Sequence, residues 1–162
     1  MEHYWVRIAD ESLVFSAAHF ITYGKEVCES LHGHNYRVKA RVRGPLDENQ
    51  CVVDFAALRE ALRAVLSDLD HRTLLPAAHP LIHLAAGSQE VEARFGDRRW
   101  VFPRADCVLL PIANTTAELL ARYLAARLLE VLRERLAIRP TSVEIELEEC
   151  FGQSAVCELR DL

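Results

Sequence analysis

The chain has 162 residues and a mass of 18.4 kDa, so we expect residues 1–162 to form a single domain with one hydrophobic core. Hydrophobic residues make up 51% and charged residues 27%, which excludes a disordered, collagen-like or low-complexity chain. The net charge of −5 provides no overall basic field, so we expect neither nucleic acid nor an anionic membrane as a partner.

The start of the chain, Met-Glu-His-Tyr-Trp, lacks the basic residues and the apolar segment of a signal peptide. No apolar run approaches the roughly 20 residues that a membrane-spanning helix needs. Scattered cysteines without a Cys-x-x-Cys pair are typical of reduced thiols, so we expect a cytoplasmic location. Four cysteines lack chemically suggestive neighbours and are interpreted as small buried residues: Cys51, Cys107, Cys150 and Cys157.

The N-terminal part of the chain predicts two strands. Residues 4–16 are rich in aromatic and β-branched side chains and predict one strand with a bulge. Residues 34–43 alternate between apolar and basic side chains, which predicts a half-buried strand with a cationic face. Gly44-Pro45 is expected to end this second strand.

Two amphipathic helices are predicted in the middle of the chain. The first covers residues 55–69 and has Asp54 as its N-cap. The second runs from about 116 to 136, where Thr115 and Glu118 are spaced as a capping box.

The remaining segments predict a hairpin and two closing strands. Gly96-Asp97-Arg98 is expected to turn a hairpin inside the polar segment 79–113. Residues 142–149 alternate again, and residues 154–160 predict a final strand. The order is therefore β-β-α-(hairpin)-α-β-β, an α+β fold.

Three histidines are the strongest candidates for chemistry. His32 and His34 are separated by Gly33, and on an extended chain both side chains leave the same face. His19 ends the first strand and meets them if the two strands pair antiparallel. Three neutral imidazoles with an open position favour a catalytic zinc site over iron or nickel. The alternatives are ordinary surface histidines and, for His19, a buried side chain bonded to the backbone.

Cys28 precedes His32 by four residues and is a candidate base or nucleophile. A thiol beside a divalent cation loses its proton more easily than a free thiol. The alternatives are a fourth metal ligand or an inert loop cysteine.

Three further residues have both a functional and a structural interpretation. Asp70 can orient His71 for proton transfer, although a histidine at a helix end is also favoured by the helix dipole. Glu148 can bind adjacent N–H groups of a heterocycle, although it also belongs to a row of solvated carboxylates.

With these residues assembled, the chain resembles the 6-pyruvoyl-tetrahydropterin synthase / 6-carboxy-tetrahydropterin synthase family. The matching pieces occur in the order that is typical of the family, over about residues 13–150. They are Phe15-Ser-Ala-Ala-His19, Cys28-x-x-x-His32-Gly-His34-Asn-Tyr, Val53-Asp-Phe55, Leu69-Asp-His71, Thr116-Ala-Glu118-Leu-Leu-Ala121 and Glu148.

The resemblance implies a tunnelling fold (T-fold), whose subunits close a barrel as a trimer or a dimer of trimers. It also implies residue roles. Zinc is bound by His19, His32 and His34; Cys28 is the general base; and Asp70 with His71 moves protons, in some members from a neighbouring subunit. Glu148 anchors the pterin, with Thr116 as a further substrate-binding candidate.

The implied substrate is 7,8-dihydroneopterin triphosphate. The three-residue gap between Cys28 and His32 favours the queuosine-pathway 6-carboxy enzymes, which release acetaldehyde and triphosphate, over the pyruvoyl synthases. Two departures are the long segment 79–113 and Glu149, where the family tends to have threonine. Both allow an altered pterin substrate.

Two other functions remain open from the sequence. One is a non-catalytic zinc-stabilised assembly module, in which Cys28 closes a Cys-His3 site. The other is a cyclohydrolase-like enzyme of the same fold, which opens a purine ring and releases formate.

Overall fold

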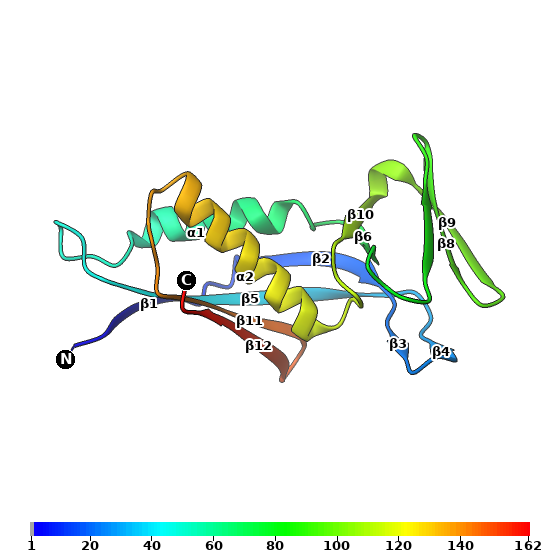
Figure 1. The fold of residues 1–162 in the computed structure, drawn as a ribbon, viewed down its shortest axis with the longest axis horizontal. Coiled ribbons are helices and arrows are strands. Elements are labelled where there is room, and N and C mark those ends of the chain that lie inside the picture. Colours follow the sequence, from blue (N-terminus) through cyan, green and yellow to red (C-terminus); the bar gives the residue numbers. More distant parts are fainter. Residues whose placement is uncertain (1) are drawn as a thin grey trace.

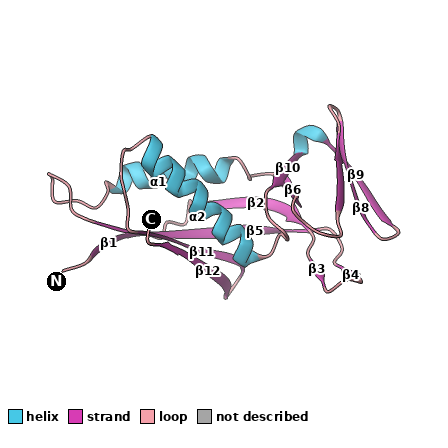
Figure 2. Cartoon of the chain, viewed as in Figure 1, coloured by secondary structure: helices cyan, strands magenta, loops and turns pink. Residues whose placement is uncertain are grey.

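The computed structural model describes residues 2–162 as a mixed sheet covered on one face by helices (Figures 1 and 2). Its strands, in chain order, are β1 (Tyr4–Ile8), β2 (Val14–His19), β5 (His32–Gly44), β6 (Arg72–Pro76), β10 (Cys107–Leu110), β11 (Ser142–Cys150) and β12 (Gln153–Arg160). Their lateral order is β10-β6-β2-β5-β11-β12, and β1 also pairs with β5. The predicted order of the main elements is confirmed.

The first predicted strand is divided in two. Both β1 and β2 pair antiparallel with β5, β1 along residues 40–44 and β2 along residues 32–37. A turn closed by the hydrogen bond from the Leu13 amide to the Asp10 carbonyl (3.0 Å) separates them. The predicted bulge is therefore a full turn, which lets one edge of β5 accept both strands in succession.

The helices α1 (Phe55–Ser67) and α2 (Ala117–Glu134) pack against the same face of the sheet (Figure 1). The Asp54 carboxylate caps α1 by accepting from the Ala57 amide at 2.9 Å, as predicted. The cap of α2 is Thr116, whose hydroxyl accepts from the Leu119 amide at 3.4 Å. The predicted capping box at Thr115 is therefore wrong by one residue, because Thr115 is fully buried and bonded elsewhere.

The core lies between the helices and the sheet. The predicted alternation along β5 is confirmed, since Tyr36, Val38, Ala40 and Val42 are all buried. They pack with the apolar face of β11 and the buried stripes of α1 and α2 in one cluster. Phe55, the first residue of α1, is 57% exposed and does not join this core.

A second, smaller layer is attached at the end of the main sheet. It contains the short pair β3 (Thr22–Tyr23) and β4 (Val27–Cys28), and the three-stranded sheet β7 (His83–Ala86), β8 (Glu90–Phe95) and β9 (Arg98–Pro103). The 3-10 helix η1 (Arg104–Asp106) leads from β9 into β10. The predicted hairpin is confirmed as β8–β9, with Gly96 at φ +55°, a backbone conformation that favours glycine.

The cysteine interpretation is only partly correct. Cys107 is buried and Cys157 is half-buried, but Cys51 and Cys150 are exposed. Over residues 2–162, no helix is long and apolar enough to span a membrane.

Candidate metal centre and active site

The three predicted histidines converge. His19 and His32 are direct partners in the β2–β5 ladder, and His34 lies on the same face of β5 as His32. One ring nitrogen from each lies within 4.8 Å of the others. A side chain at Gly33 would crowd β2, because a Cβ at this position would lie 3.1 Å from the Ala17 carbonyl oxygen. The histidine cluster can bind a metal ion.

Backbone carbonyls fix the orientation of two rings. His19 Nδ1 donates to the Thr115 carbonyl at 2.9 Å, and His32 Nδ1 donates to the Ser30 carbonyl at 2.8 Å. A carbonyl only accepts, so each Nδ1 carries a proton, and Nε2 is the ring nitrogen left for a metal. Burial lowers the pKa of His19 from 6.5 to about 4, so this ring is neutral at pH 7.

Glu149 provides the clearest sign that a cation belongs in the cluster. Its Oε1 atom lies 3.3 Å from His19 Nε2 and 3.7 Å from His34 Nε2. His19 Nε2 is buried and has no hydrogen-bond partner among residues 2–162. A lone pair thus faces a carboxylate oxygen, an arrangement that a bound cation stabilises. The donor set of imidazoles fits the divalent metal that the sequence implies.

Cys28 and Glu29 lie on the segment that leads from β4 into β5. The Cys28 side chain is half-buried and packs against the cluster formed around Phe20. Burial raises the pKa of its thiol, an effect that nearby Arg98 opposes. Glu29 Oε1 accepts from the Tyr23 hydroxyl at 3.1 Å, and its Oε2 lies 3.9 Å from His32 Nε2. A thiol and a carboxyl group are therefore neighbours in the sequence, just ahead of the candidate metal ligands His32 and His34.

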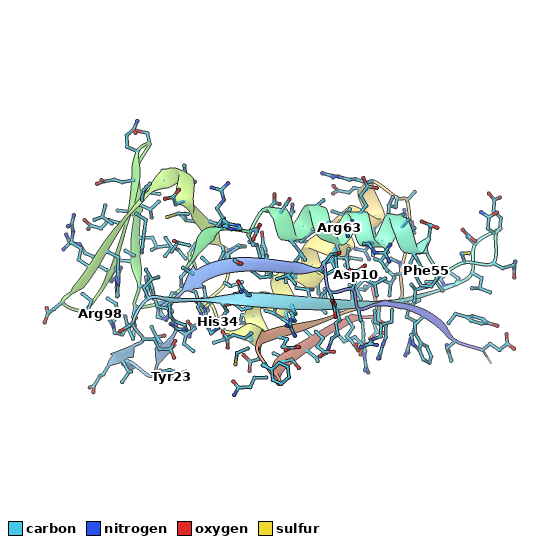
Figure 3. All side chains as sticks on the ribbon, turned by 180° about the vertical axis from the view of Figure 1, so that it is seen from behind. Asp10, Tyr23, His34, Phe55, Arg63 and Arg98 are labelled. Carbon is cyan, nitrogen blue, oxygen red and sulfur yellow. The ribbon has the colours of Figure 1, made fainter. Side chains whose placement is uncertain are left out.

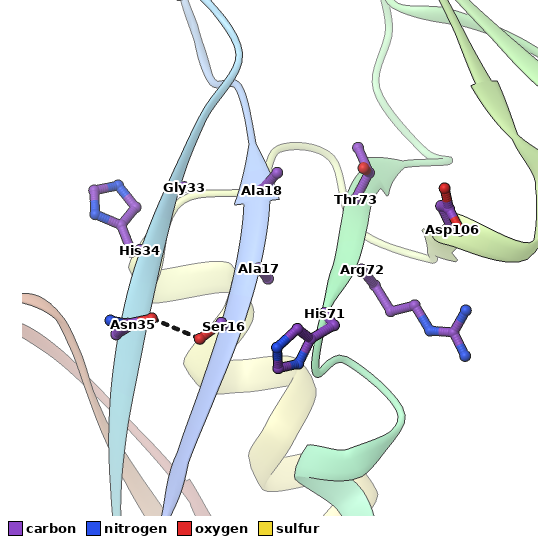
Figure 4. Close-up of a pocket in the computed structure, with 10 residues that line it drawn as sticks. All are labelled: Ser16, Ala17, Ala18, Gly33, His34, Asn35, His71, Arg72, Thr73 and Asp106. Carbon is purple, nitrogen blue, oxygen red and sulfur yellow. Dashed lines mark hydrogen bonds between the residues drawn. The ribbon is translucent and has the colours of Figure 1, made fainter.

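Asp70 and His71 form the predicted pair, at a distance from the histidine cluster. Asp70 Oδ2 lies 2.9 Å from His71 Nδ1, and Oδ1 accepts from the Ser16 amide at 2.8 Å. The Ser16 hydrogen bond lowers the pKa of Asp70 most. His71 is 81% exposed, and Figure 4 shows it on the other side of the β2–β5 pair from His34. His71 and His34 both line one cavity of about 470 Å³, but His71 is not one of the three clustered histidines.

Glu148 makes an ion pair with a basic residue of β5 rather than with a histidine. Its Oε1 atom is 3.8 Å from Arg37 Nη1, and Glu146 and Glu144 repeat this pairing with Lys39 and Arg41 along the β5–β11 ladder. The basic face of β5 is thus neutralised by β11, which agrees with the row of carboxylates read from the sequence.

Thr116 and Glu149 line one recess. This cavity of about 320 Å³ lies between the start of α2 and the β11–β12 turn, and Glu118 also lines it. Thr116 therefore reaches a concave surface as well as capping the helix. It shares that surface with the carboxylate that faces the histidines.

Three residues contact the histidines in ways that the sequence did not predict: Glu29, Thr115 and Glu149. The signal for Glu149 was present, because it has the same parity along β11 as the buried Val143, Ile145 and Leu147. Thr115 offered none, because its role depends on a contact with His19 across 96 residues of sequence.

Comparison with known proteins identifies the family to which the chain belongs. A family model described as 6-pyruvoyl tetrahydropterin synthase matches residues 9–160. A Methanocaldococcus jannaschii protein assigned as a 6-carboxy-5,6,7,8-tetrahydropterin synthase is 30% identical over 88% of each chain. The Aquifex aeolicus protein of that name is 27% identical over 76% of this chain and 74% of its own.

Solved structures agree in fold. The 6-pyruvoyl tetrahydropterin synthase of Plasmodium falciparum has a TM-score of 0.89 and 30% identity, over 98% of both chains. A catalytic-residue mutant of the Plasmodium vivax enzyme, in which a glutamate is replaced by alanine, has a TM-score of 0.89 and 28% identity over 99% of both. The expected T-fold is confirmed. The chain belongs to the 6-pyruvoyl tetrahydropterin synthase family, a family of lyases.

Proposed function

We propose that the protein converts 7,8-dihydroneopterin triphosphate to 6-carboxy-5,6,7,8-tetrahydropterin, releasing acetaldehyde and triphosphate, as a step of queuosine biosynthesis. The observation that carries the proposal is the convergence of His19, His32 and His34, in which backbone carbonyls bind Nδ1 of His19 and His32. The names of the archaeal and Aquifex relatives support the 6-carboxy product. A 6-pyruvoyl tetrahydropterin synthase is the second candidate, supported by the Plasmodium structures.

Zinc is the metal we propose for the cluster, held by His19, His32 and His34. When bound, zinc supplies Lewis-acid polarisation of the substrate's side-chain oxygens, which acidifies the neighbouring C–H bond. The chain supplies the remaining chemistry. The three imidazoles leave a position for the substrate, because Cys28 is outside the cluster of candidate ligands among residues 2–162.

Cys28 is our candidate for the group that removes a substrate proton. Glu29 is a second acid–base candidate, because its buried Oε2 lacks a hydrogen-bond partner among residues 2–162 and lies near His32. That a glutamate is the catalytic residue altered in the Plasmodium vivax mutant supports this assignment. Asp70 would hold His71 for a second proton transfer, with its carboxylate on Nδ1 and Nε2 free to react.

The pterin ring is proposed to occupy the recess lined by Thr116 and Glu149. The two oxygens of a carboxylate match the adjacent N–H groups of a pterin, and Glu149 is the carboxylate that faces both the recess and the metal ligands. Glu148, the candidate from the sequence, is paired with Arg37 outside this recess. We therefore prefer Glu149 for the anchoring role.

A homo-oligomer, a trimer or dimer of trimers, completes the proposed site. His71 is exposed, and β2 and β5 lie between it and His34, so we propose that it acts in the site of a neighbouring subunit. The closed barrel expected of the T-fold would bring neighbouring subunits together along their sheet edges.

Product analysis tests the proposal. Zinc-loaded protein is incubated with 7,8-dihydroneopterin triphosphate, and the products are identified by mass spectrometry. We expect the 6-carboxy product with acetaldehyde. A pyruvoyl product without acetaldehyde supports the second candidate, and unchanged substrate contradicts both. Metal-free protein is the control.

A further inference from the structure

The inserted sheet β7–β9 packs against the segment that holds the proposed base. A second hydrophobic cluster has Phe20 and Val91 in its buried core, with Cys28 and Trp100 packed against it. Phe20 directly follows the metal ligand candidate His19. One cluster therefore joins the insertion, the neighbour of a metal ligand and the thiol.

Arg98, at the start of β9, also contacts the backbone of the proposed base Cys28. Its guanidinium Nη1 donates to the carbonyl of Cys28 and, at 3.1 Å, to the carbonyl of Glu29. The same guanidinium lies 4.6 Å above the Trp100 ring, which stacks on Phe20 at a centroid distance of 4.6 Å. Figure 3 shows Arg98 at the same end of the molecule as Tyr23 and His34. Arg98 is thus held by an aromatic stack while it binds two consecutive carbonyls.

The next carbonyl in the chain binds a metal ligand. Ser30 follows Glu29, and its carbonyl accepts from His32 Nδ1 at 2.8 Å. Three successive peptide carbonyls therefore connect the inserted sheet to the histidine cluster. Displacing the first two would move both the Cys28 side chain and the support of His32.

The hairpin turn places Arg98 at the first position of β9. Phe95 and Arg98 are partners in the β8–β9 ladder, so the turn between them has only two residues. Gly96 has φ +55°, as the first central residue of a type II′ turn requires. Arg98 is therefore presented from a rigid strand end, a suitable base for a positioning contact.

We propose that Arg98 is a positioning residue, which holds the Cys28–Glu29 segment in register with the metal ligands. The inference rests on the proposed function, because it takes Cys28 and Glu29 as the acid–base groups. It assigns to the insertion a part in turnover, through a residue that touches neither metal nor substrate.

The test compares three variants of the zinc-loaded protein. Arg98→Ala removes the contact, Arg98→Lys keeps one donor group, and Arg99→Ala is the matched control because Arg99 pairs with Glu92 on the same hairpin. We expect Arg98→Ala to lower kcat roughly 10- to 100-fold with little change in KM, because small misplacements of a base are costly. Arg98→Lys should recover part of kcat, and Arg99→Ala should match wild type.

Hydrogen exchange provides a readout that does not depend on turnover. We expect amides of residues 27–30 to exchange faster in Arg98→Ala than in Arg99→Ala, at equal zinc content and melting temperature. Unchanged exchange, or equal kcat in the two variants, would overturn the inference. If wild-type protein leaves the pterin triphosphate unchanged, the proposed function fails, and the exchange result alone decides whether Arg98 fixes the segment.

Discussion

At the scale of single residues, two adjacent carboxylates, Glu148 and Glu149, make different contacts. Glu148 and Glu149 are sequence neighbours, yet one faces Arg37 and the other faces His19 and His34. Successive side chains of a strand point to opposite faces, so the pair samples both surfaces of the sheet. Of the two, Glu149 lines the recess that also contains Thr116.

The first prediction separates these two carboxylates. Glu149→Gln keeps the shape but loses two-oxygen recognition of N–H groups, so we expect KM for the pterin to rise at least about tenfold. Glu148→Gln is the matched control and should change KM little, because exposed ion pairs contribute weakly. The reverse order of effects in steady-state kinetics would return the anchoring role to Glu148.

The second prediction concerns the thiol. Cys28→Ala should retain zinc and melting temperature but lose at least about 100-fold in kcat, the usual contribution of a general base. Metal content and turnover are measured on the same preparation. Loss of zinc together with unfolding would instead favour the assembly module, in which Cys28 closes the metal site.

The third prediction follows from the buried imidazole of His19. Its pKa of about 4 lies below the 6.5 of the unfolded chain, so between these values only the unfolded state binds the proton. The unfolding free energy of metal-free protein should therefore be full above pH 6.5 and fall by on the order of 3 kcal/mol as pH approaches 4. Denaturant titrations measure this, and a His19→Gln variant should lack this part of the pH dependence.

At the scale of elements, long amphipathic segments were predictable and short pairings were not. The alternation in β5 and β11 and the stripes of α1 and α2 follow from local sequence alone. The pairs β2–β6 and β3–β4 are each two residues long, and β6 pairs in parallel with β10 across a long insertion. Nothing in a local pattern specifies such distant partners.

The same contrast applies to the site. The convergence of the three candidate metal ligands could be predicted, because His19 and His32 end and begin paired strands and His34 follows the strand period. The contacts of Arg98 and Thr115 could not be predicted in this way, because each joins a side chain to a backbone carbonyl that is distant in the sequence. Their roles depend on tertiary packing.

The fourth prediction is made for a helix end. Asp54→Ala should lower the unfolding free energy by about 1 kcal/mol, because the Ala57 amide loses its acceptor. Asp54→Asn is the control and should retain most of this stability, because asparagine also caps helices well. Equal losses in both variants would mean that the cap contributes through charge alone.

At the scale of the whole molecule, the separation of His71 from the histidine cluster predicts shared active sites. Cys28→Ala and His71→Ala subunits are each expected to be inactive alone. Mixed and reassembled at equal amounts, they should regain activity at about a quarter of the sites, those in which intact residues meet across an interface. No regain after reassembly would mean that each chain works alone.

We propose that three imidazoles bind one divalent ion without a sulfur ligand. X-ray absorption at the zinc edge of the zinc-loaded protein tests it directly. We expect nitrogen and oxygen neighbours at about 2.0–2.2 Å, with the nitrogens supplied by His19, His32 and His34. A sulfur neighbour at about 2.3 Å would contradict it, because Cys28 would then be a ligand rather than the base.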